Sequence, residues 1–436
     1  MSINIKLADL LREKQAQNKK LIGWRFDLHQ IQGLDIGVKN NKMGGAYSAP
    51  SFKQSVSGEI YLIWEGKRFT SAKLESKVLD DFEEYFKLWE QTAYEDPEGA
   101  GLLTPQNLPE VPLTDPQVQQ VIEGDFGKAF QLLDRGLNQI LDSGIRKVDA
   151  GVKCYHDRRY IMNSDGLMVD YLQNPVDFYF SANDSYGDGY SEKKWPDEQD
   201  YQRVIDRTVT VAKLLDKEIS ATFTGPMCLI LPPDLFESFL SQFLLTNLYG
   251  SLVVNRQSRY SLEDFQNNRQ VLRPDLTLTI NNLLPNRASS YICTSEGVPG
   301  EIRDFIRDGK LMTPILNLKY AQKIGWQPTA IPGGGGGYFL KSNRSLPDWE
   351  EQLKKTDRGL IIYSILGMHT QDASSGSFSV TADQCLLVEN GQIQGKVKAV
   401  VNGDFLGSLL REDSQLCRVE GDDNPGFWFM ANAINV

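Results

Sequence analysis

The side chains that most often carry catalysis or hold a metal ion are few and widely separated in this sequence. The histidines are His29, His156 and His369, and no two of them lie within five residues of each other. Two histidines on neighbouring turns of one helix, with a glutamate as general base, form the pattern by which a single helix holds catalytic zinc. The sequence therefore excludes a zinc-binding helix of this kind anywhere in the chain.

The cysteines also lack the spacing of a metal or redox motif. They are odd in number and form no Cys-x-x-C pair: Cys154, Cys228, Cys293, Cys385 and Cys417. This usage is typical of reduced thiols inside a cell, and we expect each to be buried and inert. Cys154 and His156 share a face of a strand without the geometry of an activated thiolate. A cysteine hydrolase and a metal site built from the three distant histidines stay open as alternatives.

Length and charge limit the class of protein. A chain of 436 residues with 41% hydrophobic residues favours two globular domains. The formal net charge of −11, without a cluster of basic residues, disfavours a nucleic-acid partner. Neither an apolar signal-peptide core nor a run of about 18–20 apolar residues is present, so we expect no membrane association and a cytoplasmic protein.

The first half of the chain predicts helices on a mostly antiparallel sheet, an α+β domain over residues 1–220. Apolar spacing predicts helices at 7–20, 72–91, 116–143 and 200–217. Short strands are expected between them. The acidic segment 181–190 lacks calcium-loop spacing and is expected to be a solvated loop.

The second half, residues 221–436, predicts a β-rich domain with a long opening helix. That helix begins at Pro233 and carries a wide apolar stripe as far as Tyr249. A short helix is expected at 300–308. The apolar run 359–366 predicts a strand, followed by a polar loop at 370–376 and strands that turn at Asn390-Gly391. Together these segments form a predicted β-meander that contains one loop rich in small polar residues.

This meander resembles the C-terminal domain of the TldD/PmbA family, described as zinc metallopeptidases and as modulators of DNA gyrase. The likeness rests on Gly367-x-His369, on Ser375-Gly-Ser-Phe-Ser379 and on Val388-Glu-Asn-Gly-x-Ile393. It continues upstream through Ser295-Glu-Gly-Val-Pro299 and Ile306-x-Asp-Gly-Lys-Leu311. The acidic charge of this chain gives no physical support to an action on gyrase-bound DNA.

Within that family, the catalytic type carries His-Glu-x-x-x-His on the helix that opens the C-terminal domain. The corresponding helix here contains Glu237 and no histidine. The resemblance is therefore to the PmbA or TldE-like type. It implies a non-catalytic partner subunit of a zinc metallopeptidase that cleaves unfolded peptides, with no cofactor in this chain and zinc only in a TldD-like partner.

The resemblance also implies where a peptide would bind. The candidates for a peptide groove are His369, Ser375, Gly376, Phe378, Gly333 and Gly335, with no catalytic or metal-binding residue among them. For His369, a structural role in its loop stays open. So do two other functions of the whole chain: a homodimer that binds peptides or proteins without hydrolysis, and an independent hydrolase whose site is assembled from distant residues.

Overall fold

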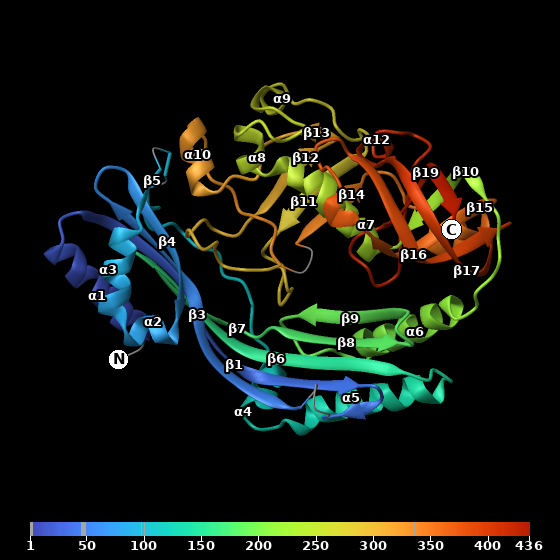
Figure 1. Ribbon diagram of the computed structural model, residues 1–436, viewed down its shortest axis with the longest axis horizontal. Helices are drawn as coiled ribbons and strands as arrows, with labels where there is room; N and C mark the ends of the chain where they lie inside the picture. Colours follow the sequence, from blue (N-terminus) through green and yellow to red (C-terminus); the bar gives the residue numbers. More distant parts are fainter. Residues whose placement is uncertain (1–2, 45–48, 97, 100, 335–336) are drawn as a thin grey trace.

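The computed structural model describes residues 3–44, 49–96, 98–99, 101–334 and 337–436. It confirms the α+β class, with three sheets and the helices packed on them (Figure 1). The elements before residue 220 are α1 (Ile3–Gln17), β1 (Leu21–Lys39), β2 (Lys42–Met43), β3 (Ser51–Trp64), β4 (Arg68–Glu75), α2 (Ser76–Asp80), α3 (Phe82–Gln91), β5 (Tyr94–Glu95), α4 (Pro116–Glu123), α5 (Gly127–Asp142), β6 (Val148–Asn163), β7 (Met168–Gln173), β8 (Val176–Ala182), β9 (Tyr186–Glu192) and α6 (Glu198–Leu215).

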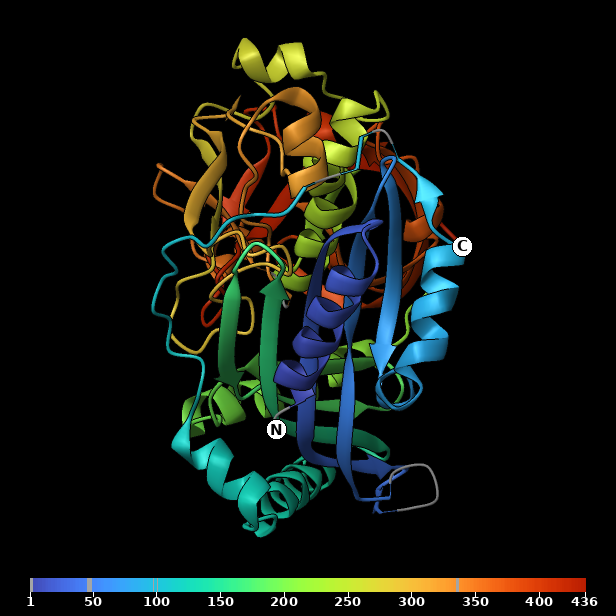
Figure 2. The same ribbon diagram turned by 90° about the vertical axis from the view of Figure 1, so that its left-hand side faces the viewer.

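The strands of this half form one antiparallel sheet in the order β5-β4-β3-β1-β6-β8-β9, with β2 paired to β1 and β7 to β6. Most even-numbered side chains of β1, such as Phe26 and Ile36, are buried beneath the helices. Alternate residues of a strand point to opposite faces. Odd-numbered residues such as Asp27 and His29 therefore face the other way, toward the C-terminal elements. Figure 2 shows α1 in front of the sheet and those elements behind it.

The elements after residue 220 build a closed ring of strands and a smaller sheet. They are β10 (Thr224–Leu231), α7 (Pro233–Phe239), the π-helix η1 (Leu240–Leu245), η2 (Thr246–Leu248), α8 (Gly250–Val254), α9 (Leu262–Gln266), β11 (Leu276–Asn281), β12 (Ile302–Arg307), β13 (Lys310–Leu311), α10 (Leu318–Ile324), β14 (Tyr338–Ser342), α11 (Trp349–Lys354), β15 (Arg358–Leu366), η3 (Met368–Thr370), β16 (Ser377–Glu389), β17 (Gln392–Asp404), α12 (Phe405–Ser408), β18 (Gln415–Cys417) and β19 (Gly426–Asn435). Because β10 pairs with both β15 and β19, strands β10-β15-β16-β17-β19 close on themselves.

The predicted meander is present as β15, β16 and β17. Asn390 and Gly391 have φ angles of 51° and 72°, which confirms the tight two-residue turn between β16 and β17. Strand β16 is continuous from Ser377 to Glu389, with an irregularity after Ala382. The second Asn-Gly pair, at 402–403, lies within β17 and makes no turn.

Two predicted segments fold differently. The segment 181–190, expected to be a loop, is the β8–β9 hairpin, which turns at Asn183 and Asp184 with φ of 51° and 54°. Segment 300–308, expected to be a helix, contains β12. In both cases cross-strand pairing supplies partners that the local sequence does not show.

Two predicted helices are also shorter than expected. Residues 72–75 belong to β4, so that helix starts at Ser76 and is divided at Asp81. The helix expected at 116–143 is broken near Gly124 into α4 and α5. Among the described residues, no helix combines the length and apolar character needed to cross a membrane.

Candidate functional site

The three histidines lie in separate places. His29 on β1 pairs through Nδ1 with Asp157 Oδ1 at 2.9 Å. His156 on β6 is opposite Gln32, so it points to the other face of the sheet from His29. It contacts the Asn174 amide at 2.9 Å, and burial lowers its pKa. His369 is exposed in η3. The described residues contain no cluster of three or more His, Cys, Asp or Glu side chains suited to a metal ion.

The five thiols are unsuited to nucleophilic catalysis. Burial raises the pKa of Cys293 to about 11 and the pKa of Cys154, Cys228, Cys385 and Cys417 to about 12. A thiol with such a pKa carries almost no thiolate at neutral pH. A cysteine hydrolase would need the opposite shift.

The opening helix carries none of the histidine ligands of a zinc-binding helix. It starts at Pro233 and passes into the π-helix η1, a geometry that brings residues five apart onto one face. With Glu237 as the glutamate of His-Glu-x-x-x-His, the two histidine positions hold Phe236 and Ser241. Phe236 is fully buried and stacks on Phe427 with ring centres 4.8 Å apart. Zinc therefore does not fit this helix.

Glu237 lies instead at a charged cavity of about 210 Å³. Residues of β9 and α6 form one side of it. On the other side are α7, Arg287, Ser289, Phe339 and the segment 421–424. Seven carboxylates and three guanidinium groups line this space, which lies between elements from the two halves of the chain.

Ion pairs neutralise part of this charge. Arg207 contacts both oxygens of Asp422, at 3.1 and 2.6 Å. Arg287 contacts Glu192 at 2.6 Å and also pairs with Asp423. Three of the remaining carboxylates, Asp188, Asp234 and Glu237, have raised pKa values because burial disfavours their charged forms. Burial raises the pKa of Asp188 to about 6 and, despite a hydrogen bond from Asn424, the pKa of Glu237 to about 7.

Comparison with known proteins shows which family this chain resembles. The model of the PmbA/TldA metallopeptidase C-terminal domain matches residues 224–413. Metalloprotease PmbA of Escherichia coli O157:H7 is 29% identical over 182 residues, which cover 41% of this chain and 39% of that protein. A PmbA homologue of Haemophilus influenzae is 22% identical over 432 residues, covering 92% of this chain and 91% of that protein. Residues 224–413 therefore match the C-terminal domain of the TldD/PmbA family, and nearly the whole chain is similar to a PmbA homologue.

Solved structures show the same fold over the whole chain. TldE from Thermococcus kodakarensis has a TM-score of 0.77 at 17% identity and covers 99% of both chains. A candidate modulator of DNA gyrase from Bacteroides thetaiotaomicron has a TM-score of 0.78 at 16% identity and covers 100% of both chains. The TldD/PmbA fold therefore extends to the N-terminal half, where the sequence motifs are weak.

The loop that the family resemblance singled out is held by the end of the opening helix and by Arg259. Asn247 donates its side-chain amide to the Ala373 carbonyl at 2.7 Å, and the Ser375 carbonyl accepts a 2.6 Å hydrogen bond from Arg259. Gly376 has φ of 73°, and a Cβ there would approach the Leu406 side chain to 2.9 Å. His369 and Ser375 are exposed on this loop, and their role in a groove stays a prediction.

The prediction that Phe378 lines the groove is corrected by its burial. Its side chain is 3% exposed and lies edge-on to Phe239, with ring centres 5.3 Å apart. It packs in the core inside the ring of strands, because even-numbered residues at the start of β16 point inward. Phe378 supports the loop from below and has no surface to offer a peptide.

Of the glycine run 333–337, the structure describes Gly333, Gly334 and Gly337. A Cβ on Gly333 would come within 2.0 Å of the Ser289 carbonyl oxygen, so only glycine fits this close approach. Ser289 lines the charged cavity, and Gly333 thus lies beside that cavity. Gly335 lies outside the described residues. Among the described residues that line the cavity, none comes from the 367–378 segment.

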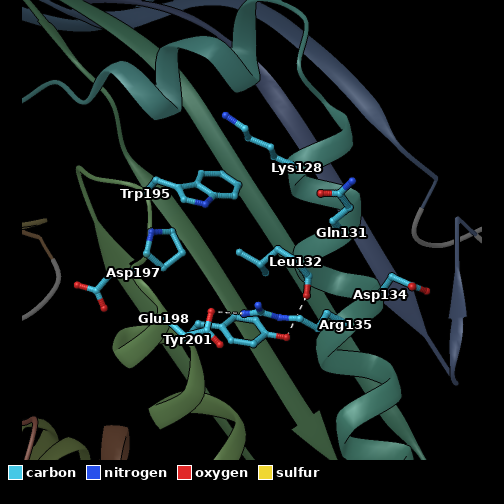
Figure 3. Close-up of a pocket in the computed structure, with 10 residues that line it drawn as sticks. Lys128, Gln131, Leu132, Asp134, Arg135, Trp195, Asp197, Glu198 and Tyr201 are labelled. Carbon is cyan, nitrogen blue, oxygen red and sulfur yellow. Dashed lines mark hydrogen bonds and ion pairs between the residues drawn. The ribbon is translucent and has the colours of Figure 1, made fainter.

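A second cavity, of about 470 Å³, lies between α5 and the start of α6 (Figure 3). Its guanidinium group is already engaged: Arg135 lies 3.8 Å from the centre of the Tyr201 ring and 3.0 Å from Glu198. Lys128 and Trp195 line the other side (Figure 3). This cavity shares no lining residue with the one around Glu237.

Sequence reasoning missed the charged cavity as a site. Its carboxylates come from segments far apart in the chain, including Asp188, Glu237 and Asp422. Two signals were visible: the acidic segment 181–190, and the two carboxylates Asp234 and Glu237 on the opening helix. Neither signal alone shows that the two segments meet.

Proposed function

We propose that this chain is the non-catalytic partner subunit of a TldD/TldE-like zinc metallopeptidase that degrades or processes unfolded peptides. In this complex the TldD-like subunit supplies zinc and the general base. This chain contributes part of the peptide groove and carries no cofactor of its own. We place the complex in the cytoplasm, in keeping with five cysteines that form no disulfide.

The observation that carries this proposal is the state of the opening helix. The fold of TldE is kept over the whole chain, while Phe236 and Ser241 occupy the positions at which histidines would hold zinc. Phe236 packs in the aromatic core, so this position has no room for a zinc-binding histidine that faces a site. The names of the relatives, metalloprotease PmbA and TldE, support the connection with peptide hydrolysis.

The test is co-expression with a paralogue that carries His-Glu-x-x-x-His, followed by purification through a tag on this chain. We expect a stable complex that cleaves an unfolded peptide and contains zinc, whereas this chain alone binds no zinc and cleaves nothing. Replacing the motif glutamate of the paralogue by glutamine is expected to abolish cleavage. His156→Ala and Cys228→Ser in this chain serve as controls, and both are expected to leave cleavage by the complex unchanged.

Other outcomes select the alternatives. A chain that never associates with such a paralogue, and that binds peptides as a homodimer, is a binding module without hydrolysis. A purified chain that holds one metal ion and cleaves peptides unaided is an independent hydrolase. Either result overturns the proposal.

A further inference from the structure

The charged cavity beside Glu237 has a surplus of negative charge after its ion pairs are counted. Arg207 is taken by Asp422, and Arg287 by Glu192 and Asp423. Asp188 is enclosed and lacks a hydrogen-bonded cation: its side chain is only 6% exposed. The cavity therefore contains an enclosed carboxylate that receives no hydrogen bond from a cation among the described residues.

The two oxygens of Asp188 differ in their contacts. Oδ1 accepts a 2.7 Å hydrogen bond from the Gly189 amide. Oδ2 is buried and has no hydrogen-bond donor among the described residues. The guanidinium nitrogens of Arg207 and Arg203 lie 3.6 and 3.9 Å away, beyond hydrogen-bond distance. A buried carboxylate oxygen without a donor is costly unless a ligand supplies one.

We propose that this cavity binds the primary ammonium group of a peptide, with Asp188 Oδ2 as its principal acceptor. An ammonium group carries three donors and a full positive charge, so it can satisfy several carboxylates at once. A metal ion is disfavoured, because the described residues hold no cluster of three or more ligating side chains. A cavity of about 210 Å³ has room for the end of a chain.

The adjoining cavity indicates which kind of side chain accompanies the ammonium group. It has a volume of about 630 Å³ and meets the charged cavity at Arg203, Arg207 and Asp234, which line both. Its remaining walls are largely apolar and include Trp349, Leu353, Ile361, Tyr363 and Ile393. The preferred ligand therefore has an apolar side chain next to its ammonium group.

This inference rests on the proposed role in peptide handling and names the chemistry that the chain recognises. The ammonium group has two possible sources, the amino terminus of a peptide and a lysine side chain. Both present the same donors to Asp188. The adjoining apolar cavity favours the amino terminus of a peptide that begins with a large apolar residue.

Isothermal titration of the purified full chain at pH 7 with Leu-Ser-Ala-Gly-Ser-Ala amide tests the proposal. We expect N-acetylation to raise Kd by at least about tenfold, or about 1.4 kcal/mol. Replacing the leading Leu by Ser is expected to weaken binding severalfold. In Asp188→Asn, which keeps an acceptor for Gly189, the free and acetylated peptides are expected to bind equally weakly. Asp184→Asn, on the exposed turn of the same hairpin, is the matched control and should bind as the unmodified chain does.

An acetylated peptide with Lys in place of Leu separates the two sources. Tight binding of this peptide assigns the site to lysine side chains and keeps the role of Asp188. Absence of measurable binding, no effect of acetylation, or an unchanged Kd in Asp188→Asn overturns the ammonium site. The subunit proposal is judged separately, because association with a histidine-bearing paralogue and its cleavage of fully acetylated peptides do not depend on this cavity.

Discussion

The Asn424 side chain donates a 2.7 Å hydrogen bond from Nδ2 to Oε1 of Glu237. Asn424 also donates to the Tyr338 carbonyl at 3.0 Å and accepts from the Leu340 amide at 3.0 Å. It therefore joins α7, β14 and the segment before β19 through one buried side chain. The glutamate that serves as a base in a zinc-binding helix is here part of a structural network.

Glu237→Gln is predicted to change how stability depends on pH. Burial raises the pKa of Glu237 from 4.5 to about 7, so the folded state binds more protons than the unfolded state between these values. The stability that this group gives is complete below pH 4.5 and is lost as the pH rises through 7. Gln stays neutral and can still accept from Asn424.

The variant should therefore match the unmodified chain near pH 4.5 and exceed it at pH 8 by no more than about 3 kcal/mol. Chemical denaturation at both pH values measures this difference. A constant difference across the range would show that Glu237 does not titrate with a raised pKa.

Asn424→Ala is predicted to destabilise the protein at every pH. It leaves the Glu237 carboxylate, the Tyr338 carbonyl and the Leu340 amide without their hydrogen bonds to Asn424. Each buried group left unsatisfied costs about 1–3 kcal/mol. We expect a loss of roughly 3 kcal/mol, measured as the free energy of unfolding. Asn138→Ala is the matched control, because its exposed side chain makes a single 3.3 Å contact with Asp134. Equal stability of the two variants would contradict the structural role of Asn424.

Much of the local architecture could be predicted, because it depends on short-range signals. Asn390-Gly391 favours positive φ at both turn positions, and Pro233 suits the first turn of a helix. The prediction of a helix at 300–308 was wrong because β12 pairs with β11 through residues more than twenty positions away. Its strand character depends on that pairing and not on its own periodicity.

The candidate site was predicted only in part for the same reason. The exposure of His369 follows from a loop of small polar residues. The charged cavity requires Asp188, Glu237 and Asp422 to meet, and their separation in sequence gives no hint of that contact. The interruption of the opening helix by a π turn was also hidden, because its apolar stripe continues through Leu245.

Phe378→Ala is predicted to act on stability and not on peptide contact. The removed ring is buried against Phe239 and Phe429, and such a truncation costs about 3–5 kcal/mol. Phe52→Ala is the control, since that ring is 48% exposed and its loss should cost far less. Thermal denaturation distinguishes the two variants. A stable Phe378→Ala chain with impaired peptide binding would show instead that Phe378 contacts the peptide.

His369→Ala is predicted to separate function from stability. The side chain is exposed in η3, so its removal should change the free energy of unfolding by less than about 0.5 kcal/mol. If the loop borders the groove, the variant loses a contact with the bound peptide, so KM for partner-dependent cleavage should rise. The value of kcat should stay the same, because the partner subunit carries the catalytic groups. Thr370→Ala, also exposed on this loop, controls for a general loosening of the turn, since its hydroxyl donates to the Gly367 carbonyl at 2.9 Å. Unchanged KM in the His369→Ala complex would show that this histidine serves only its own loop.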